Sequence, residues 1–243
     1  MRKKHPPAPG SSYISYRHVL ITLFFIVVPF IFLLFFSRVA KIATGALFYD
    51  FFISSVRLLI AYVISLVLAW FIAAAFYRGR RSLVALPAFD VLQSFPTFAA
   101  LPIATIFFGR TNFTVIFFLT ITIIWPIFFS IISSFKLIRS DWREAVKISG
   151  LRRLDYLRYF LLPASVPAII TGSIIGLGEG WEALVATEII VNINPGLGSF
   201  FNFFTTNPKI TGFGIFGLLV LIFSLNKLVW FPLLEWSHHK MEE

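Results

Sequence analysis

The sequence predicts an all-α, polytopic membrane protein with six transmembrane helices and with both termini in the cytoplasm. Three observations lead to this fold class. The 243 residues are 58% hydrophobic and only 13% charged, whereas soluble domains contain about 25% charged residues. Six apolar stretches are long enough to cross the roughly 30 Å hydrocarbon core as helices. Lysines and arginines are distributed unequally between the segments that connect these stretches.

The first three stretches are 19–36, 51–77 and 83–108. Prolines and polar residues separate the first from the basic N-terminus, and no small-residue cleavage site follows it, so we expect a retained helix and not a signal peptide. Arg57 interrupts the second stretch. The third is the weakest, because it contains three prolines together with Asp90 and Gln93.

The last three stretches are 113–135, 164–191 and 212–234. The fourth carries no charge, the fifth contains three glutamates, and the sixth contains Lys227. None of the six shows the two-residue alternation of a barrel strand, which leaves the α-helix as the way to span the bilayer.

Basic residues determine the expected orientation. Fifteen lysines and arginines lie in the set of segments that includes both termini, and four lie in the opposite set, namely Arg38, Lys41, Arg110 and Lys209. Because cytoplasmic segments carry the excess of Lys and Arg, both termini are expected in the cytoplasm. The predicted organisation is a cytoplasmic tail over 1–18, a six-span domain over 19–235 with a long cytoplasmic loop at about 136–165, and a cytoplasmic tail over 236–243.

Composition also excludes several functions. The chain contains no cysteine, so disulfides and thiolate metal sites are excluded, and we predict no metal site. The net charge is +10, and the basic residues lie in short segments beside the apolar stretches. This placement indicates that they set the orientation of the protein in the membrane and do not bind nucleic acid. No phosphate-binding loop of the Gly-x-x-x-x-Gly-Lys-Ser/Thr type is present. The Gly-rich string GLGEG lies within a predicted span, so we expect neither bound ATP nor catalysis in this chain.

The loop between the fourth and fifth stretches has a distinctive pattern. Its sequence, REAVKISGLRRLDYLRYFLLPASVP over 143–167, begins with good helix formers that follow a Ser-Asp pair able to cap a helix. Gly150 can end that helix in a left-handed turn. Apolar residues then recur at helical spacing, and Pro163 and Pro167 are expected to mark a joint with the fifth span. We therefore predict a helix–turn–helix lying on the membrane.

This loop resembles the cytoplasmic loop of ABC importer permeases, which has the pattern Glu-Ala-Ala, three residues, Gly, nine residues, Ile-x-Leu-Pro. Here Glu144-Ala145-Val146 precedes Gly150 by the same spacing, and Leu162-Pro163 ends the pattern. Val146 and Phe160 depart from it with other apolar residues. The stretches SVRLLIAYVISLVLAW, SFPTFAALPIATIFFG, GSIIGLGEGWEALVATEI and NPGLGSF are similar to the nitrate/sulfonate/taurine group of this family.

The resemblance implies an ABC type I importer permease fold in a prokaryotic cytoplasmic (inner) membrane. It implies that the loop residues Glu144, Ala145, Gly150, Leu162 and Pro163 dock on a separate ABC ATPase dimer, which would bind ATP and Mg. It also implies a second permease subunit, identical or different, and an extracytoplasmic solute-binding protein that delivers a small oxyanion, sulfonate-like or related organic solute. The alternative interpretation of the loop is an amphipathic segment that binds the membrane surface through anionic lipid.

Ionisable and polar residues within the spans are the candidates for a translocation path, because such groups are costly in hydrocarbon and are commonly functional or paired. The candidates are Glu179, Glu182, Glu188, Arg57 and Gln93. The structural alternative is pairing of the glutamates with Arg57 or Lys227. Ionised glutamates on the path would repel an anion, which leaves a cationic or neutral solute open. The alternative function is an ion-coupled carrier or channel that uses these glutamates.

Three glycines of the fifth span, Gly172, Gly176 and Gly180, are spaced four residues apart. Small residues at this spacing let two helices approach closely in a membrane. The functional interpretation places them on the face where two permease subunits meet. The alternative is packing within one chain.

Overall fold

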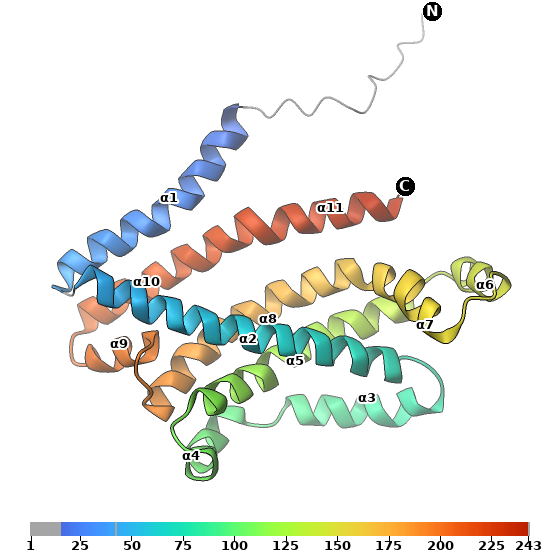
Figure 1. Ribbon diagram of the computed structural model, residues 1–243, viewed down its shortest axis with the longest axis horizontal. Helices are drawn as coiled ribbons and strands as arrows, with labels where there is room; N and C mark the ends of the chain where they lie inside the picture. The colour runs from blue at the N-terminus through green and yellow to red at the C-terminus, as the bar shows by residue number, and fades with distance from the viewer. Residues whose placement is uncertain (1–15, 42, 243) are drawn as a thin grey trace, which may run out of the picture.

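The computed structural model describes residues 16–41 and 43–242, and within these residues every regular element is helical (Figure 1). The predicted N-terminal tail lies almost wholly outside the described residues. The helices are α1 Tyr16–Val39, α2 Thr44–Phe76, α3 Arg80–Gln93, α4 Thr97–Phe108, α5 Asn112–Leu137, α6 Ser140–Ile148, α7 Arg153–Tyr156, α8 Leu162–Val191, α9 Leu197–Phe203, α10 Pro208–Leu225 and α11 Phe231–Glu242. Two π-helical turns, η1 Leu157–Leu161 and η2 Asn226–Trp230, join α7 to α8 and α10 to α11.

In the described part of the chain, five helices are long and apolar enough to cross a membrane, and a sixth crossing results if α3 and α4 together form one span. These two helices meet at an 80° bend, so the predicted third stretch, 83–108, consists of two helices, and the break lies among the prolines and polar residues that made it the weakest of the six. Pro96 has no N–H to donate and pushes the residue before it out of the helical conformation, which ends α3 and starts α4 in a new direction.

The core is formed by α5 packed against α2 on one side and α8 on the other (Figure 1). Ile123, Ile127, Ile131 and Phe135 on α5 have no exposed surface. These residues follow a spacing of four and therefore form one stripe along α5. The uncharged fourth stretch thus becomes the central helix of the bundle.

The three glycines of α8 face α5 of the same chain. A Cβ atom on Gly172 would lie 2.7 Å from the Ile127 Cα, and one on Gly176 would lie 3.1 Å from the Ile123 carbonyl oxygen. A Cβ on Gly180 would lie 2.9 Å from the Ile123 side chain. The three glycines therefore allow α8 to pack closely against α5 within one chain. The interpretation of this stripe as a face between subunits is not supported.

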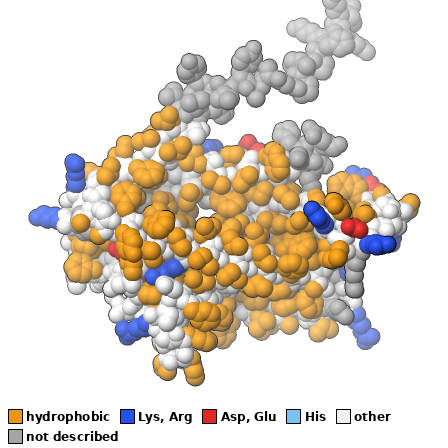
Figure 2. All heavy atoms as spheres, in the orientation of Figure 1, with side chains coloured by type: hydrophobic (Ala, Val, Ile, Leu, Met, Phe, Trp, Pro, Cys, Tyr) orange, Lys and Arg blue, Asp and Glu red, His pale blue; other side chains and the backbone are white. Residues whose placement is uncertain are grey.

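The outer helices carry the apolar surface. α1 packs along α10 at the side of the bundle, where Phe32 stacks on Phe213 and lies against Phe216. Figure 2 shows hydrophobic side chains over the middle of the molecule, with lysines and arginines mostly towards its two ends. Large exposed apolar patches are rare on soluble monomers, so this band fits contact with lipid.

Two predicted helix limits differ from the structure. The helix that follows Gly150 continues through η1 into α8 as one span, Leu154–Val191, without the joint expected at Pro163. The Leu162 N–H donates to the Leu157 carbonyl in the wider π turn, which moves the preceding turn away from the Pro163 ring. The last helix continues to Glu242 and does not end near residue 235.

Candidate functional site

The α6 segment forms an exposed corner at one end of the bundle, beside the C-terminus of α5 (Figure 1). No residue of α6 is buried, and Ile148 and Leu154 are 87% and 79% exposed. Gly150 has φ +66°, a left-handed conformation that favours glycine. The prediction of a helix that ends at Gly150 and a second helix after it is confirmed. Glu144 and Ala145 lie on the exposed surface of this corner.

Hydrogen bonds fix this corner to the membrane helices. The Arg143 guanidinium donates to the carbonyl oxygens of Phe135 and Lys136, at 3.0 and 3.3 Å, at the end of α5. These carbonyls have no partner within their own helix, because they belong to its last turn. The hydroxyls of Tyr77 and Tyr156 lie 2.8 Å apart and join α2 to α7. These contacts connect α6 to α5 and α7 to α2.

The tyrosine pair can be tested by one substitution. Tyr156→Phe is expected to lower the free energy of unfolding by about 1 kcal/mol, because it removes one hydrogen bond between half-buried groups. Chemical denaturation of the detergent-solubilised protein measures this loss. Tyr159→Phe is the matched control, because that ring is 63% exposed and should change stability little. Equal effects of the two substitutions would show that the hydrogen bond between Tyr77 and Tyr156 does not stabilise the contact of α2 with α7.

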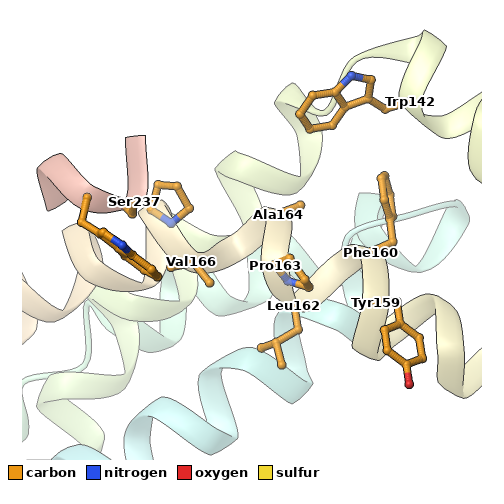
Figure 3. Close-up of a pocket in the computed structure, with 10 residues that line it drawn as sticks. Trp142, Tyr159, Phe160, Leu162, Pro163, Ala164, Val166 and Ser237 are labelled. Carbon is orange, nitrogen blue, oxygen red and sulfur yellow. The ribbon is translucent and has the colours of Figure 1, made fainter. Parts of the chain in front are cut away.

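An apolar pocket of about 570 Å³ lies between α6, the start of α8 and α11. Figure 3 shows the Trp142 ring of α6 above this pocket and the Phe160 ring pointing towards it. Leu162 and Pro163, predicted as part of the coupling loop, line the same pocket. The pocket therefore brings the end of the sequence motif next to Trp142 of α6.

A second feature is a cleft at the break between α3 and α4, here named the α3–α4 cleft, whose lining mixes polar and apolar residues. Its volume is about 790 Å³, and it brings together Glu179 and Gln93, two of the predicted path residues. It is lined by Gln93, Ser94, Phe95, Pro96, Thr97, Phe98, Ala99, Ile121, Thr122, Trp125, Pro126, Phe129, Ser130, Ile175 and Glu179. A broken helix within a membrane is tolerated where it lines a cavity.

A groove of about 490 Å³ continues from this cleft towards the α6 end, and Ser130 lines both. The groove runs between α5 and α8 and carries the hydroxyls of Ser130, Ser133, Ser134 and Thr171 before it reaches Arg139. Sequence reasoning missed these hydroxyl residues. A signal was present, because Ser133 and Ser134 lie three and four residues after Ser130 and therefore share one side of α5 with it.

Glu182 lies elsewhere. It lines an apolar groove of about 540 Å³ between α8 and α10, together with Trp181, Leu218 and Ile222. Spacing of three residues puts Glu179 and Glu182 on neighbouring parts of the helix surface, but their side chains belong to different depressions. Among the described residues, neither carboxylate has a hydrogen bond or ion pair.

Arg57 and Glu188 form a buried ion pair. The Arg57 Nη1 lies 2.5 Å from the Glu188 Oε1, and the two side chains are 5% and 0% exposed. Neither residue lines the α6 pocket, the α3–α4 cleft, the groove that continues from it or the groove beside Glu182. Their predicted place on the translocation path is therefore not supported, because their charges are satisfied by each other inside the helix packing.

The ion pair also holds the connection after α8. Ser54 donates to both oxygens of Glu188, at 2.8 and 2.9 Å, and the Gly198 N–H donates to Oε2 at 2.8 Å. The Asn112 side chain accepts a hydrogen bond from the Arg57 Nε. A Cβ on Gly196 would lie 2.7 Å from Arg57, which explains a glycine in the NPGLGSF stretch. We name these residues the outer clamp; sequence reasoning missed Ser54 and Asn112.

Comparison with known proteins gives one family match and several relatives. The model of the family described as binding-protein-dependent transport system inner membrane component matches residues 65–231. A nitrate import permease protein, NrtB, of Leptolyngbya laminosa is 36% identical over 149 residues, which are 60% of this chain and 52% of that protein.

Two further relatives are similar over comparable lengths. A bicarbonate transport system permease protein, CmpB, of Synechococcus elongatus is 32% identical over 114 residues, covering 47% of this chain and 41% of the relative. A taurine transport system permease protein, TauC, of Escherichia coli is 29% identical over 143 residues, covering 57% and 52%. The chain thus spans about half the length of the curated relatives it matches.

Proposed function

Because the chain belongs to the family of binding-protein-dependent transport system inner membrane components, we propose that it is the membrane-spanning permease subunit of an ATP-driven importer. The family is one of transport components and not of enzymes. The proposed location is a prokaryotic cytoplasmic membrane, with the α6 end in the cytoplasm. This orientation follows from the excess of basic residues in the segments on that side.

The exposed corner at α6 is the observation that carries the proposal. It presents Glu144, Ala145 and Ile148 to a partner, while Arg143 ties its base to the end of α5. A short helix that is exposed on its outer face and fixed at its base can transmit a movement, which a flexible loop would absorb. We propose that an ABC ATPase docks here and that its ATP and Mg stay on the ATPase.

The remaining partners are part of the same proposal. Two ATPase subunits need two docking corners, so a second permease subunit, identical or different, would complete the assembly. A solute-binding protein would deliver the solute at the opposite end, beside α9. ATP binding can change the state of the spans only if it stabilises one arrangement of the corners more than the other.

The solute would pass along the α3–α4 cleft and the hydroxyl groove of α5 and α8. The hydroxyls provide hydrogen bonds to a polar solute that has lost part of its water. The relatives are named for nitrate, bicarbonate and taurine, so the proposed solute class is a small oxyanion, sulfonate-like or related organic solute, which the lining of the cleft narrows further. Because Glu179 lines the cleft, its carboxylate affects which charge on the solute can be bound there.

The docking proposal is tested by purifying the full chain from its own cells in mild detergent and identifying any co-purified protein that contains an ATP-binding phosphate loop. Gly150→Pro is expected to reduce the co-purified ATPase at least about tenfold, because proline requires φ near −65° where this residue has +66°. Glu144→Arg should give a similar loss by reversing an exposed charge within the corner.

Glu235→Arg is the matched control for the charge reversal, because Glu235 is an exposed carboxylate on α11. It should leave the ATPase bound. Two results would contradict the proposal: no ATPase with the unmodified chain, or equal recovery with all three variants. Uptake by the purified chain alone, driven by an ion gradient, would instead favour the carrier alternative, for which the unpaired Glu179 and Glu182 would be the ion sites.

A further inference from the structure

The α3–α4 cleft contains an acidic side chain, Glu179, without a basic partner. Of the residues that line it, Glu179 alone is charged. No lysine or arginine side chain lines the cleft, and among the described residues the Glu179 carboxylate accepts no hydrogen bond. Glu188, by contrast, has Arg57, Ser54 and Gly198 as partners. An ionisable group left without partners inside a membrane span marks a site for a ligand or an ion.

The surroundings of Glu179 add features that suit a cation. Trp125 lines the same cleft and is half-buried. Aromatic faces attract ammonium groups through the electrons of the ring, and tryptophan does so best. The Gln93 amide nitrogen donates to Asp90 at 2.6 Å, which leaves its carbonyl oxygen as an acceptor at the cleft. A carboxylate, an indole and an amide oxygen all favour a hydrogen-bond donor with a positive charge.

Other lining groups suit a polar solute without selecting its charge. The Ser130 hydroxyl has no hydrogen bond among the described residues and can donate or accept. The first turn of α4 begins after Pro96 without a side-chain cap. The Ala99 and Ala100 N–H groups donate to the Pro96 carbonyl, which leaves those of Thr97 and Phe98 open to an acceptor on the solute. An acidic group on the solute therefore also has donors in the cleft, at a place other than Glu179.

We infer that the α3–α4 cleft binds a solute that carries an ammonium or another cationic nitrogen group, with Glu179 as its counter-ion, and that the cleft rejects simple oxyanions such as nitrate and bicarbonate. This inference rests on the proposed function, since it concerns the solute on the proposed path. Of the three solutes for which the relatives are named, taurine alone has an ammonium group. Nitrate and bicarbonate would meet only repulsion at Glu179.

The experiment compares two probes that differ in one group. Taurine and 2-hydroxyethanesulfonate share the sulfonate and the two-carbon chain, but the first has an ammonium where the second has a hydroxyl. Their binding to the full chain in lipid nanodiscs is measured by equilibrium dialysis with labelled probes, and ethanolamine and nitrate serve as cation-only and anion-only competitors. We expect taurine to bind at least about tenfold more tightly than its hydroxyl counterpart, as for one charge-assisted hydrogen bond. We also expect ethanolamine, and not nitrate, to displace taurine.

Substitutions identify the residue responsible. Glu179→Gln keeps the shape of the side chain and removes its charge, so it should weaken taurine binding about 10- to 100-fold and bring the two sulfonates to similar affinity. Glu235→Gln, the same change on the surface of α11, should leave both affinities unchanged. Thermal unfolding of each variant shows that the fold is retained.

Three results would overturn the inference: equal binding of the two sulfonates, binding of neither, or a preference for taurine that persists in Glu179→Gln. A preference of the unmodified chain for nitrate would overturn it as well. The nanodisc experiment needs no ATPase, so its outcome is independent of the docking test. A chain that binds its ATPase but fails here would keep the proposed function and lose only the assignment of the solute.

Discussion

Replacing Glu188 with alanine is expected to lower the free energy of unfolding by about 3–5 kcal/mol, the usual effect of leaving one charge of a buried pair without its partner. Arg57 would remain almost fully buried, with the Asn112 side chain as its one remaining hydrogen-bond partner among the described residues. The hydrogen bonds from Ser54 and from the Gly198 N–H would be lost together with the ion pair. The outer clamp would then release the connection between α8 and α9.

The measurement is chemical denaturation in detergent, with hydrogen exchange to locate the loosened segment. Exchange should rise first at the amides of residues 196–198. A double variant, Arg57→Met with Glu188→Leu, serves as the control, because apolar replacement of both members of a buried pair is often neutral. It should recover most of the loss. If Glu188→Ala costs less than about 1 kcal/mol, the ion pair does not hold the outer clamp.

Adding one methyl group at Gly172 is the second large expected effect. The Cβ of Gly172→Ala would lie 2.7 Å from the Ile127 Cα and 3.0 Å from the Pro126 carbonyl oxygen. Both are backbone atoms, so α5 and α8 must separate to make room. Overpacking of this kind costs about 1–3 kcal/mol. We expect a loss of that size in the free energy of unfolding, measured by denaturation in detergent.

Gly178→Ala is the matched control on the same helix. A Cβ on Gly178 meets no atom within 4 Å, and alanine is favoured over glycine in a helix by about 1 kcal/mol. This variant should therefore be as stable as the unmodified chain or slightly more stable. A similar response at both positions would show that α8 does not pack against α5 through Gly172.

The helical elements could be predicted well from the sequence, because they depend on local properties of the chain. Runs of apolar residues give the long helices, and the break at Pro96 falls in the stretch that its prolines and polar residues marked as weakest. Gly150 was expected in a left-handed turn and has φ +66°. The expected joint at Pro163 failed, because the π turn before it allows the helix to continue.

The candidate site could be predicted only in part, since its residues come together from distant positions. Gln93 and Glu179 were named as path residues and share the α3–α4 cleft. Arg57 and Glu188 were named with them but lie in the outer clamp. Ser130 and Thr171 were not named; the spacing of the serines shows that hydroxyls share one side of α5, but only the packing of α5 against α8 shows that this side lines a groove.

The sequence by itself determined that this is a helical membrane protein, where its helices run, and that an exposed helical corner precedes the fifth span. These properties follow from hydropathy, charge and backbone preferences of neighbouring residues. The tertiary structure alone decided which charges are paired and which are free. Arg57 and Glu188 are 131 residues apart in the chain, and only the packing of α2 against α8 and α9 brings them into contact. Among the residues that the structure describes, the same packing leaves Glu179 without a partner, because no lysine or arginine lines its cleft.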